Sequence, residues 1–228
     1  MSEDHGTWRQ SVFSRLGLWS QAQYQPIDQV RYVVIDSELT GLNRQNDALI
    51  ALAAIRMQGS RIMVGETFYR LINPQREMAR DNIVVHRIRP SELVDQPTVA
   101  TVLDEFAEFI GDDVVVGHFV RIDWSFIKRD MQIHRGRQLR NRTLDTCKAY
   151  QWFDLQNRTM DGSYAYGMAQ DLDCNLFTVA QKMDLPVSEA HHALYDAWLA
   201  ASLWQRFVVM FKAYGVRRLG DLTPIARG

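Results

Sequence analysis

Three apolar runs, rich in β-branched and aromatic residues, open the body of the chain. They span residues 30–36, 48–57 and 61–72, and the turn-like segments TGLNRQND and QGS separate them. Runs of this kind predict β-strands, and short turns between consecutive strands predict hairpins. The first part of the body is therefore expected to be an antiparallel meander.

Beyond Asn73 the apolar positions change to helical spacing, broken by two short apolar strands. Helices are predicted near residues 80–86 and 90–94, then over 98–110, 119–133, 176–185 and 189–214, with strands at 112–117 and 142–146. Residues 154–175 lack clear periodicity and are predicted to be a long loop. The order of elements predicts an α/β fold, a mixed five-stranded sheet flanked by helices.

The two ends of the chain are predicted to be appendages. Apolar residues recur at helical spacing between Thr7 and Ser20, so an N-terminal helix and a linker are expected over residues 1–29. The main domain is assigned to residues 30–214 and a C-terminal tail to 215–228. The N-terminal helix either covers the domain itself or docks a protein partner, and both alternatives stay open.

Composition narrows the class of protein. The chain has 228 residues, enough for one full core, and 26 basic residues balance 27 acidic ones. Bulk charge therefore gives no general attraction to nucleic acid or membrane. The absence of a signal-like start or a long apolar span predicts a cytoplasmic protein without membrane contact. Cys147 and Cys174 are expected to be free thiols.

Two acids lie at the end of the first apolar run and just beyond it, in the stretch VVIDSELTGL. Residues two apart on a strand point to one face, so Asp36 and Glu38 project together while Ser37 faces the other way. At about 4 Å and an effective dielectric near 20, two such charges repel by roughly 4 kcal/mol. Solvent, a shared proton or cations must offset that repulsion.

Two further acids follow other buried elements. Asp123 comes after the predicted strand at 112–117, and Asp196 lies at the start of the last long helix. His191 is expected in the turn before that helix, because five positions on a regular helix would separate it from Asp196 by about 140°. Alternatively, His191 is an exposed histidine near the helix cap.

A set of carboxylate ligands that contains no cysteine selects hard divalent ions. Two Mg²⁺ or Mn²⁺ ions held by these acids would suit displacement at phosphorus, since they would activate water and stabilise the leaving oxyanion. His191 could then accept the proton from the water. The reaction class indicated is phosphodiester hydrolysis.

The ordered set of motifs resembles the DEDDh branch of the DnaQ-like 3′–5′ exonucleases. The family's D-x-E-T-T-G-L motif is similar to residues 36–42, its G-H-N segment ending in Asp to residues 117–123, and its H-x-A-x-x-D motif to residues 191–196. The resemblance spans residues 30–203. The family includes the proofreading subunit of the bacterial replicative polymerase. It implies a ribonuclease H-like fold.

The resemblance also implies roles for individual residues. The metal ligands would be Asp36, Glu38, Asp123 and Asp196, with His191 as general base. Substrate contacts would come from Thr40, Gly41, Leu42 and His118. Without the resemblance, Gly41 is a turn glycine and Leu42 a core residue.

Three positions depart from the family pattern. Leu39 replaces a threonine, Phe119 replaces the usual asparagine and Arg87 stands where glycine is common. The change at Phe119 removes an amide that could position substrate. None of the departures alters the four acids.

The resulting hypothesis is a metal-dependent 3′–5′ exonuclease acting on single-stranded nucleic acid, with DNA favoured. The alternatives are an RNA or oligonucleotide exonuclease of the same family, and a silent module that binds nucleic acid or a polymerase. The basic segment 128–142 either tracks phosphates or is a solvated surface. The aromatic residues near Trp152 and Tyr164 either stack on bases or pack the domain.

Overall fold

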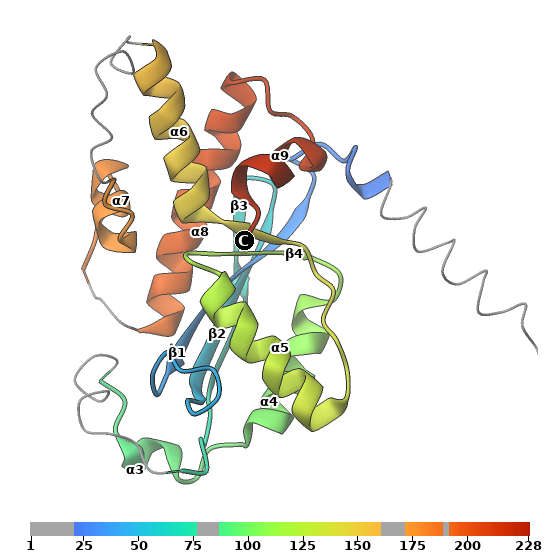
Figure 1. Ribbon diagram of the computed structural model, residues 1–228, viewed down its shortest axis with the longest axis vertical. Helices are drawn as coiled ribbons and strands as arrows, with labels where there is room; N and C mark the ends of the chain where they lie inside the picture. Colours follow the sequence, from blue (N-terminus) through green and yellow to red (C-terminus); the bar gives the residue numbers. More distant parts are fainter. Residues whose placement is uncertain (1–20, 77–86, 161–171, 189–191) are drawn as a thin grey trace, which may run out of the picture.

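The computed structural model describes residues 21–76, 87–160, 172–188 and 192–228 (Figure 1). Within these ranges the centre is a five-stranded sheet in the order β3-β2-β1-β4-β5. The strands are β1 (Arg31–Leu39), β2 (Leu49–Gln58), β3 (Arg61–Leu71), β4 (Val114–Gly117) and β5 (Thr143–Asp145). Strands β1 to β3 pair antiparallel, whereas β4 pairs parallel with both β1 and β5. The predicted meander and mixed sheet are confirmed.

Helices cover both faces of the sheet. They are α3 (Pro90–Leu93), α4 (Val99–Ile110), α5 (Arg121–Arg135), α6 (Thr146–Met160), α7 (Leu176–Lys182), α8 (Ala193–Ala213) and α9 (Leu219–Ala226). The helices predicted near 90–94 and over 98–110, 119–133 and 176–185 are confirmed, and α8 confirms the described part of the helix predicted over 189–214. The predicted helices at 7–20 and 80–86 lie outside the described residues.

The prediction of a loop from residue 154 onward is wrong for residues 154–160, which continue α6. Beyond Phe153 the described side chains of this helix are not buried, so the apolar period disappears from the sequence. Polar contacts support the helix instead. Asp154 pairs with Arg158 four residues later at 2.6 Å, and the hydroxyl of Tyr214 donates to Oδ1 of Asn157 at 2.7 Å.

Side chains of β1 alternate between two cores. Tyr32 and Val34 pack with α6, α7, α8 and α9, whereas Val33 and Ile35 pack with α4 and α5. Figure 1 shows the two groups of helices, with α6 beside α8 and α4 beside α5. Because alternate strand residues share a face, Asp36 and Glu38 belong to the α8 side of the sheet and Ser37 to the α5 side.

Small residues let the start of α8 approach β2 closely. Ala51 and Ala53 of β2 share a buried cluster with Ala193 and Ala197 of α8. The two β2 alanines pair directly with Glu38 and Asp36. Alanine side chains leave room beside the acids, and the close approach brings the first turn of α8 to the end of β1.

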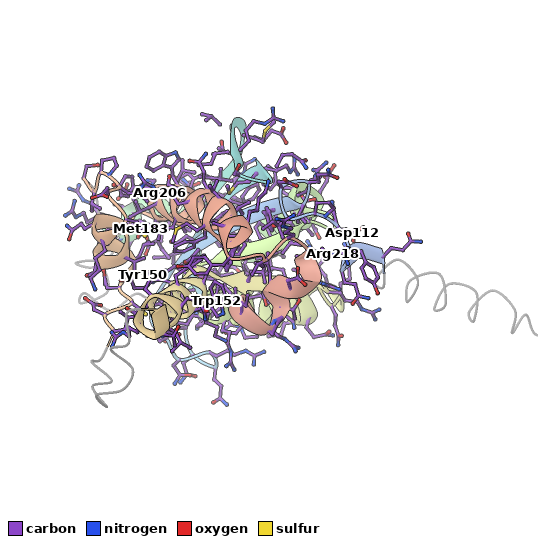
Figure 2. All side chains as sticks on the ribbon, turned by 90° about the horizontal axis from the view of Figure 1, so that it is seen from above. Asp112, Tyr150, Trp152, Met183, Arg206 and Arg218 are labelled. Atoms are coloured by element: carbon purple, nitrogen blue, oxygen red, sulfur yellow. The ribbon has the colours of Figure 1, made fainter. Side chains whose placement is uncertain are left out.

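Aromatic side chains fill the space between α6 and α8. The Phe153 ring lies 4.6 Å from that of Phe211, measured between centroids, and Trp152 lies 5.6 Å from Phe211 and 5.5 Å from Tyr214. Figure 2 labels Trp152 on α6. The packing alternative is therefore confirmed for Phe153 and Trp152. Tyr164 and Tyr166 lie outside the described residues.

The C-terminal residues pack against the domain. Leu219, Leu222 and Ala226 of α9 are buried in the same core as α6 and α8. The N–H of Gly228 donates to the carbonyl of Thr143 at 3.1 Å, beside strand β5. The division of the chain into residues 1–29, 30–214 and 215–228 stays a prediction.

We expect Leu222→Ala to lower the free energy of unfolding by about 2–5 kcal/mol, because it leaves a cavity at a fully buried position. Urea unfolding followed by circular dichroism measures the change. The matched control is Val209→Ala on α8, where the side chain is 59% exposed and about 0.5 kcal/mol or less is expected. An unchanged urea midpoint for Leu222→Ala would show that α9 unfolds separately from the domain.

Two negative findings complete the fold. Cys147 and Cys174 are buried free thiols, as predicted. In the part of the chain that the structure describes, every helix is too short or too polar to cross a bilayer.

Candidate active site

Three carboxylates meet where β1 ends and α8 begins. One oxygen from each of Asp36, Glu38 and Asp196 lies within 4.8 Å of the other two. The two β1 acids share the face that carries α8, as the strand alternation predicts, and Asp196 lies in the first turn of the helix. Residues far apart in the sequence therefore form one acidic cluster.

Asp123 approaches this cluster from the opposite layer of the fold. It lies in the first turn of α5, and the hydroxyl of Ser37 donates to its Oδ1 at 2.5 Å. Ser37 faces away from the β1 acids, as predicted, but its contact with the fourth acid could not be predicted from the sequence pattern. The contact holds Asp123 at the end of β1, close enough for its charge to act on Asp36.

Burial and mutual repulsion raise the pKa values of the acids. The pKa of Glu38 rises to about 8, first because the side chain is buried and then because Asp196 and Asp123 are near. The same causes raise the pKa of Asp36 well above its ordinary value. Burial raises the pKa of Asp123 to about 6, although the hydrogen bond from Ser37 opposes the rise. The cluster is therefore unfavourable for four negative charges without counterions.

The donor set fits hard divalent cations. All four groups are carboxylates, and Asp123 and Asp196 also lie at helix N-termini, where the helix dipole favours an anion. Oxygen-only clusters of this kind suit Mg²⁺ or Mn²⁺ rather than softer metals. Bound dications would offset the repulsion that burial intensifies.

The loop after β1 is held by one carboxylate. Oδ1 of Asp47 accepts from the Thr40 hydroxyl at 3.1 Å, and Oδ2 accepts from the N–H of Asn43 at 2.7 Å. A Cβ on Gly41 would lie 2.5 Å from the same carboxylate, so the turn requires glycine at this position. Leu42 is 74% exposed, which excludes the alternative of a core residue.

Asp47→Ala is expected to loosen this loop. The variant loses both hydrogen bonds, which lowers the free energy of unfolding by about 1–2 kcal/mol. If Leu42 contacts substrate, KM for an oligonucleotide should rise while kcat changes little. Steady-state nuclease kinetics with thermal unfolding measures both effects. Leu42→Ala is the comparison, with a raised KM but unchanged stability, and an unchanged KM in both variants would remove the loop from substrate binding.

His118 is committed to contacts within the protein. Its Nδ1 lies 2.8 Å from the Thr146 hydroxyl, and its Nε2 lies 2.5 Å from the carbonyl oxygen of Cys174. Burial lowers its pKa. The ring thus joins β4, α6 and the segment before α7, while its direct contact with substrate stays a prediction. His191 lies outside the described residues.

Tyr69 is a site residue that the sequence did not reveal. It pairs with Ala53 across the sheet, and Ala53 pairs with Asp36, so the three share a face. Burial and the nearby charge of Glu38 raise the pKa of its hydroxyl. The Tyr69 ring stacks on exposed His192 at 5.2 Å between centroids. The position of Tyr69 depends on the register of β1, β2 and β3, and this register cannot be predicted from a single sequence.

Part of the basic segment 128–142 is occupied in structural contacts. Both oxygens of Asp130 accept from Arg129, which also donates to the carbonyls of Arg44 and Asp47. Arg135 pairs with Asp104. Arg129 therefore anchors the loop after β1, whereas phosphate tracking by the rest of the segment stays a prediction.

Comparison with known proteins agrees with this geometry. The sequence pattern of the RNase T exonuclease family matches residues 33–204. The chain belongs to this exonuclease family. It is 32% identical over 199 residues to the DNA polymerase III subunit epsilon of Aquifex aeolicus, covering 86% of this chain and 90% of that protein. It is also 28% identical to a PolC-type DNA polymerase III of Thermotoga maritima, of which it spans 13%.

Solved exonucleases share the fold. Exonuclease X in complex with 5′ overhanging duplex DNA matches with a TM-score of 0.61 at 17% identity, over 85% of this chain and 98% of that one. E. coli exonuclease I in complex with a dT13 oligonucleotide matches with a TM-score of 0.64 at 16% identity, over 82% and 43%. The expected ribonuclease H-like fold of the DnaQ-like exonucleases is confirmed.

Two departures from the family pattern fall at left-handed backbone positions. Arg87 has a φ of 58° and Phe119 a φ of 52°. The family's usual glycine and asparagine are residue types that tolerate this conformation. The chain therefore has the left-handed backbone geometry that suits the usual family residues while presenting different side chains.

Proposed function

We propose that this family member is a metal-dependent 3′–5′ exonuclease that hydrolyses phosphodiester bonds of single-stranded DNA and releases nucleoside 5′-monophosphates. The observation that carries the proposal is the cluster of Asp36, Glu38 and Asp196, with Asp123 beside it. The similarity to a DNA polymerase III epsilon subunit along nearly its whole length favours DNA over RNA.

The four acids would hold two divalent ions, Mg²⁺ or Mn²⁺. Bound in this pocket, the ions would neutralise the acids, increase the acidity of water and stabilise charge on the leaving oxygen. Rigid elements of the fold position the four carboxylates. Asp36 and Glu38 stand on a central strand, Asp196 is fixed by the start of α8, and Ser37 orients Asp123.

His191 would accept a proton from the attacking water. Its immediate neighbour His192 is the N-cap of α8, and Asp196 follows in the first turn. In the sequence, His191 thus comes directly before the N-cap of the helix that carries Asp196. Histidine is the side chain most often used for such proton transfer.

The substrate end would lie beside the loop after β1. Leu42 is exposed there and offers an apolar surface to the terminal base, while Thr40 and Gly41 shape the turn that presents it. The proposal of a polymerase partner rests on the similarity to the epsilon subunit, and the helix predicted from the sequence over residues 7–20 would be its docking element. Co-elution with a replicative polymerase subunit, lost on deleting residues 1–20, would support it, and unchanged co-elution would contradict that docking site.

The proposal is tested with matched DNA and RNA oligonucleotides labelled at the 3′-terminal nucleotide, each with Mg²⁺ and with Mn²⁺. We expect the first cleavage to release the label as mononucleotide, faster from DNA than from RNA, and no release with EDTA. Faster release from RNA would select the alternative substrate. Binding without any cleavage in either metal would select the silent binding module.

A further inference from the structure

An exposed aromatic ring lies in the turn that leads into α5, the helix that carries Asp123. Phe119, in the turn between β4 and α5, has 44% of its surface exposed. Large apolar side chains exposed singly are common on protein surfaces and need no explanation. The backbone, the neighbours and the position of this ring distinguish it from such cases.

The fold does not favour phenylalanine at this position. A φ of 52° is unfavourable for a bulky side chain, and glycine or asparagine would adopt it more easily. The turn is held through backbone groups, because the Asp145 carboxylate accepts from the N–H groups of Phe119 and Val120 at 3.3 and 3.1 Å. The ring is therefore displayed by the turn and is not needed to form it.

His118 fixes the direction of the ring. The two rings meet edge to face, with centroids 4.6 Å apart and planes inclined by 72°. His118 is itself fixed, because both ring nitrogens contact the protein at Thr146 and Cys174. The Phe119 ring thus has a rigid support on one side and solvent on the other.

The turn that carries the ring lies beside the strand of the first two acids. Strands β1 and β4 are parallel neighbours, and the pairing of Val34 with Val116 places the turn after Gly117 level with the end of β1. Asp123 follows four residues after Phe119 in the first turn of α5, and Ser37 joins it to β1. A nucleic acid whose phosphate lay at the acids would have nucleosides within reach of this ring.

We infer that Phe119 is a stacking platform for a nucleobase near the 3′ end of the substrate. The inference rests on the proposed function and deepens it, since it names a base contact at the same site. Aromatic rings stack on any base with little regard to sequence. A single-stranded or unpaired end would therefore bind better than a paired one, whose bases are already stacked.

The test is a double-mutant cycle, in which the Phe119 ring is removed from the protein and a base is removed from the oligonucleotide, separately and together. Phe119→Ala and the wild type are compared on a DNA oligonucleotide and on three versions with an abasic tetrahydrofuran at the last, second-last or third-last nucleotide. Affinity is measured by fluorescence anisotropy in Ca²⁺, and kcat/KM in Mn²⁺. The ring is expected to contribute a factor of roughly 5 to 100 on the intact oligonucleotide.

Stacking predicts that this factor disappears with one of the abasic oligonucleotides, because the ring then has no base to contact. Phe119→Tyr should retain affinity within about threefold, and Phe119→Asn should lose affinity while raising Tm by about 2 °C through relief of strain. Tyr24→Ala, an exposed aromatic remote from the acids, is the matched control and should change neither readout.

An equal factor on all four oligonucleotides would overturn the inference, as would unchanged affinity of Phe119→Ala for the intact one. A fall in Tm with Phe119→Ala or Phe119→Asn would indicate a structural role and would also contradict it. If the wild type released no mononucleotide, the proposed function would fail. The anisotropy cycle in Ca²⁺ would still decide the role of Phe119.

Discussion

Asp36→Asn is expected to reduce mononucleotide release by roughly 1,000-fold or more while making the metal-free protein more stable. The carboxylate is central to the cluster, since its pKa responds to Asp123, Asp196 and Glu38. Asparagine keeps the shape of the side chain but loses the charge that a dication needs. Without metal, that same charge repels its neighbours, so its removal relieves strain in the pocket.

The two effects are measured by a single-turnover nuclease assay and by thermal unfolding in EDTA. We expect Tm to rise by about 2–4 °C for each kcal/mol of repulsion relieved. Asp112→Asn is the matched control, because Asp112 is an exposed acid just before β4, at the strand end opposite the acidic cluster (Figure 2). Loss of activity together with a lower Tm would instead assign Asp36 an architectural role.

Chelation is expected to abolish activity completely and to leave a protein whose stability falls as pH rises. The folded pKa of Glu38 is about 8 and that of Asp123 about 6, both above their ordinary values near 4.5 and 3.8. Between the unfolded and folded values, the folded state binds more protons than the unfolded state. The stability that these two acids contribute is therefore fully present below about pH 4 and is lost as pH rises through about 6 for Asp123 and about 8 for Glu38.

The comparison of wild type with Glu38→Gln isolates this effect. One proton of difference corresponds to about 1.4 kcal/mol per pH unit, so the wild-type decline should be steeper than that of the variant by up to this amount between about pH 5 and 8. Saturating Mn²⁺ should make the stability of the wild type less dependent on pH. Binding of Mn²⁺ should also release protons from the protein. Urea unfolding across the pH range, with and without metal, measures the slopes. Identical slopes in EDTA would show that Glu38 titrates normally.

Much of this site follows from local sequence. Strand alternation places Asp36 and Glu38 on one face, and the order of apolar elements indicates that Asp123 and Asp196 begin helices. These features depend on periods of two and 3.6 residues, which a sequence displays directly. The mixed sheet follows in the same way from the run of strands and helices.

Features that depend on contacts between distant segments could not be predicted from the sequence. Tyr69 reaches the site only through the register of three strands, and Ser37 meets Asp123 only when two layers pack. The end of α6 is stabilised by an ion pair and a tyrosine contact, which leave no apolar period. The left-handed turn at Phe119 carries no glycine or asparagine to reveal it.

Asp36, Glu38, Asp123 and Asp196 are proposed to form one site for divalent ions, and calorimetric titration of Mn²⁺ into the metal-free protein measures that binding. We predict saturable uptake of two ions per chain, accompanied by proton release near neutral pH, and a loss of uptake in Asp36→Asn. No uptake by the wild type, or equal uptake by the wild type and Asp36→Asn, would contradict the claim.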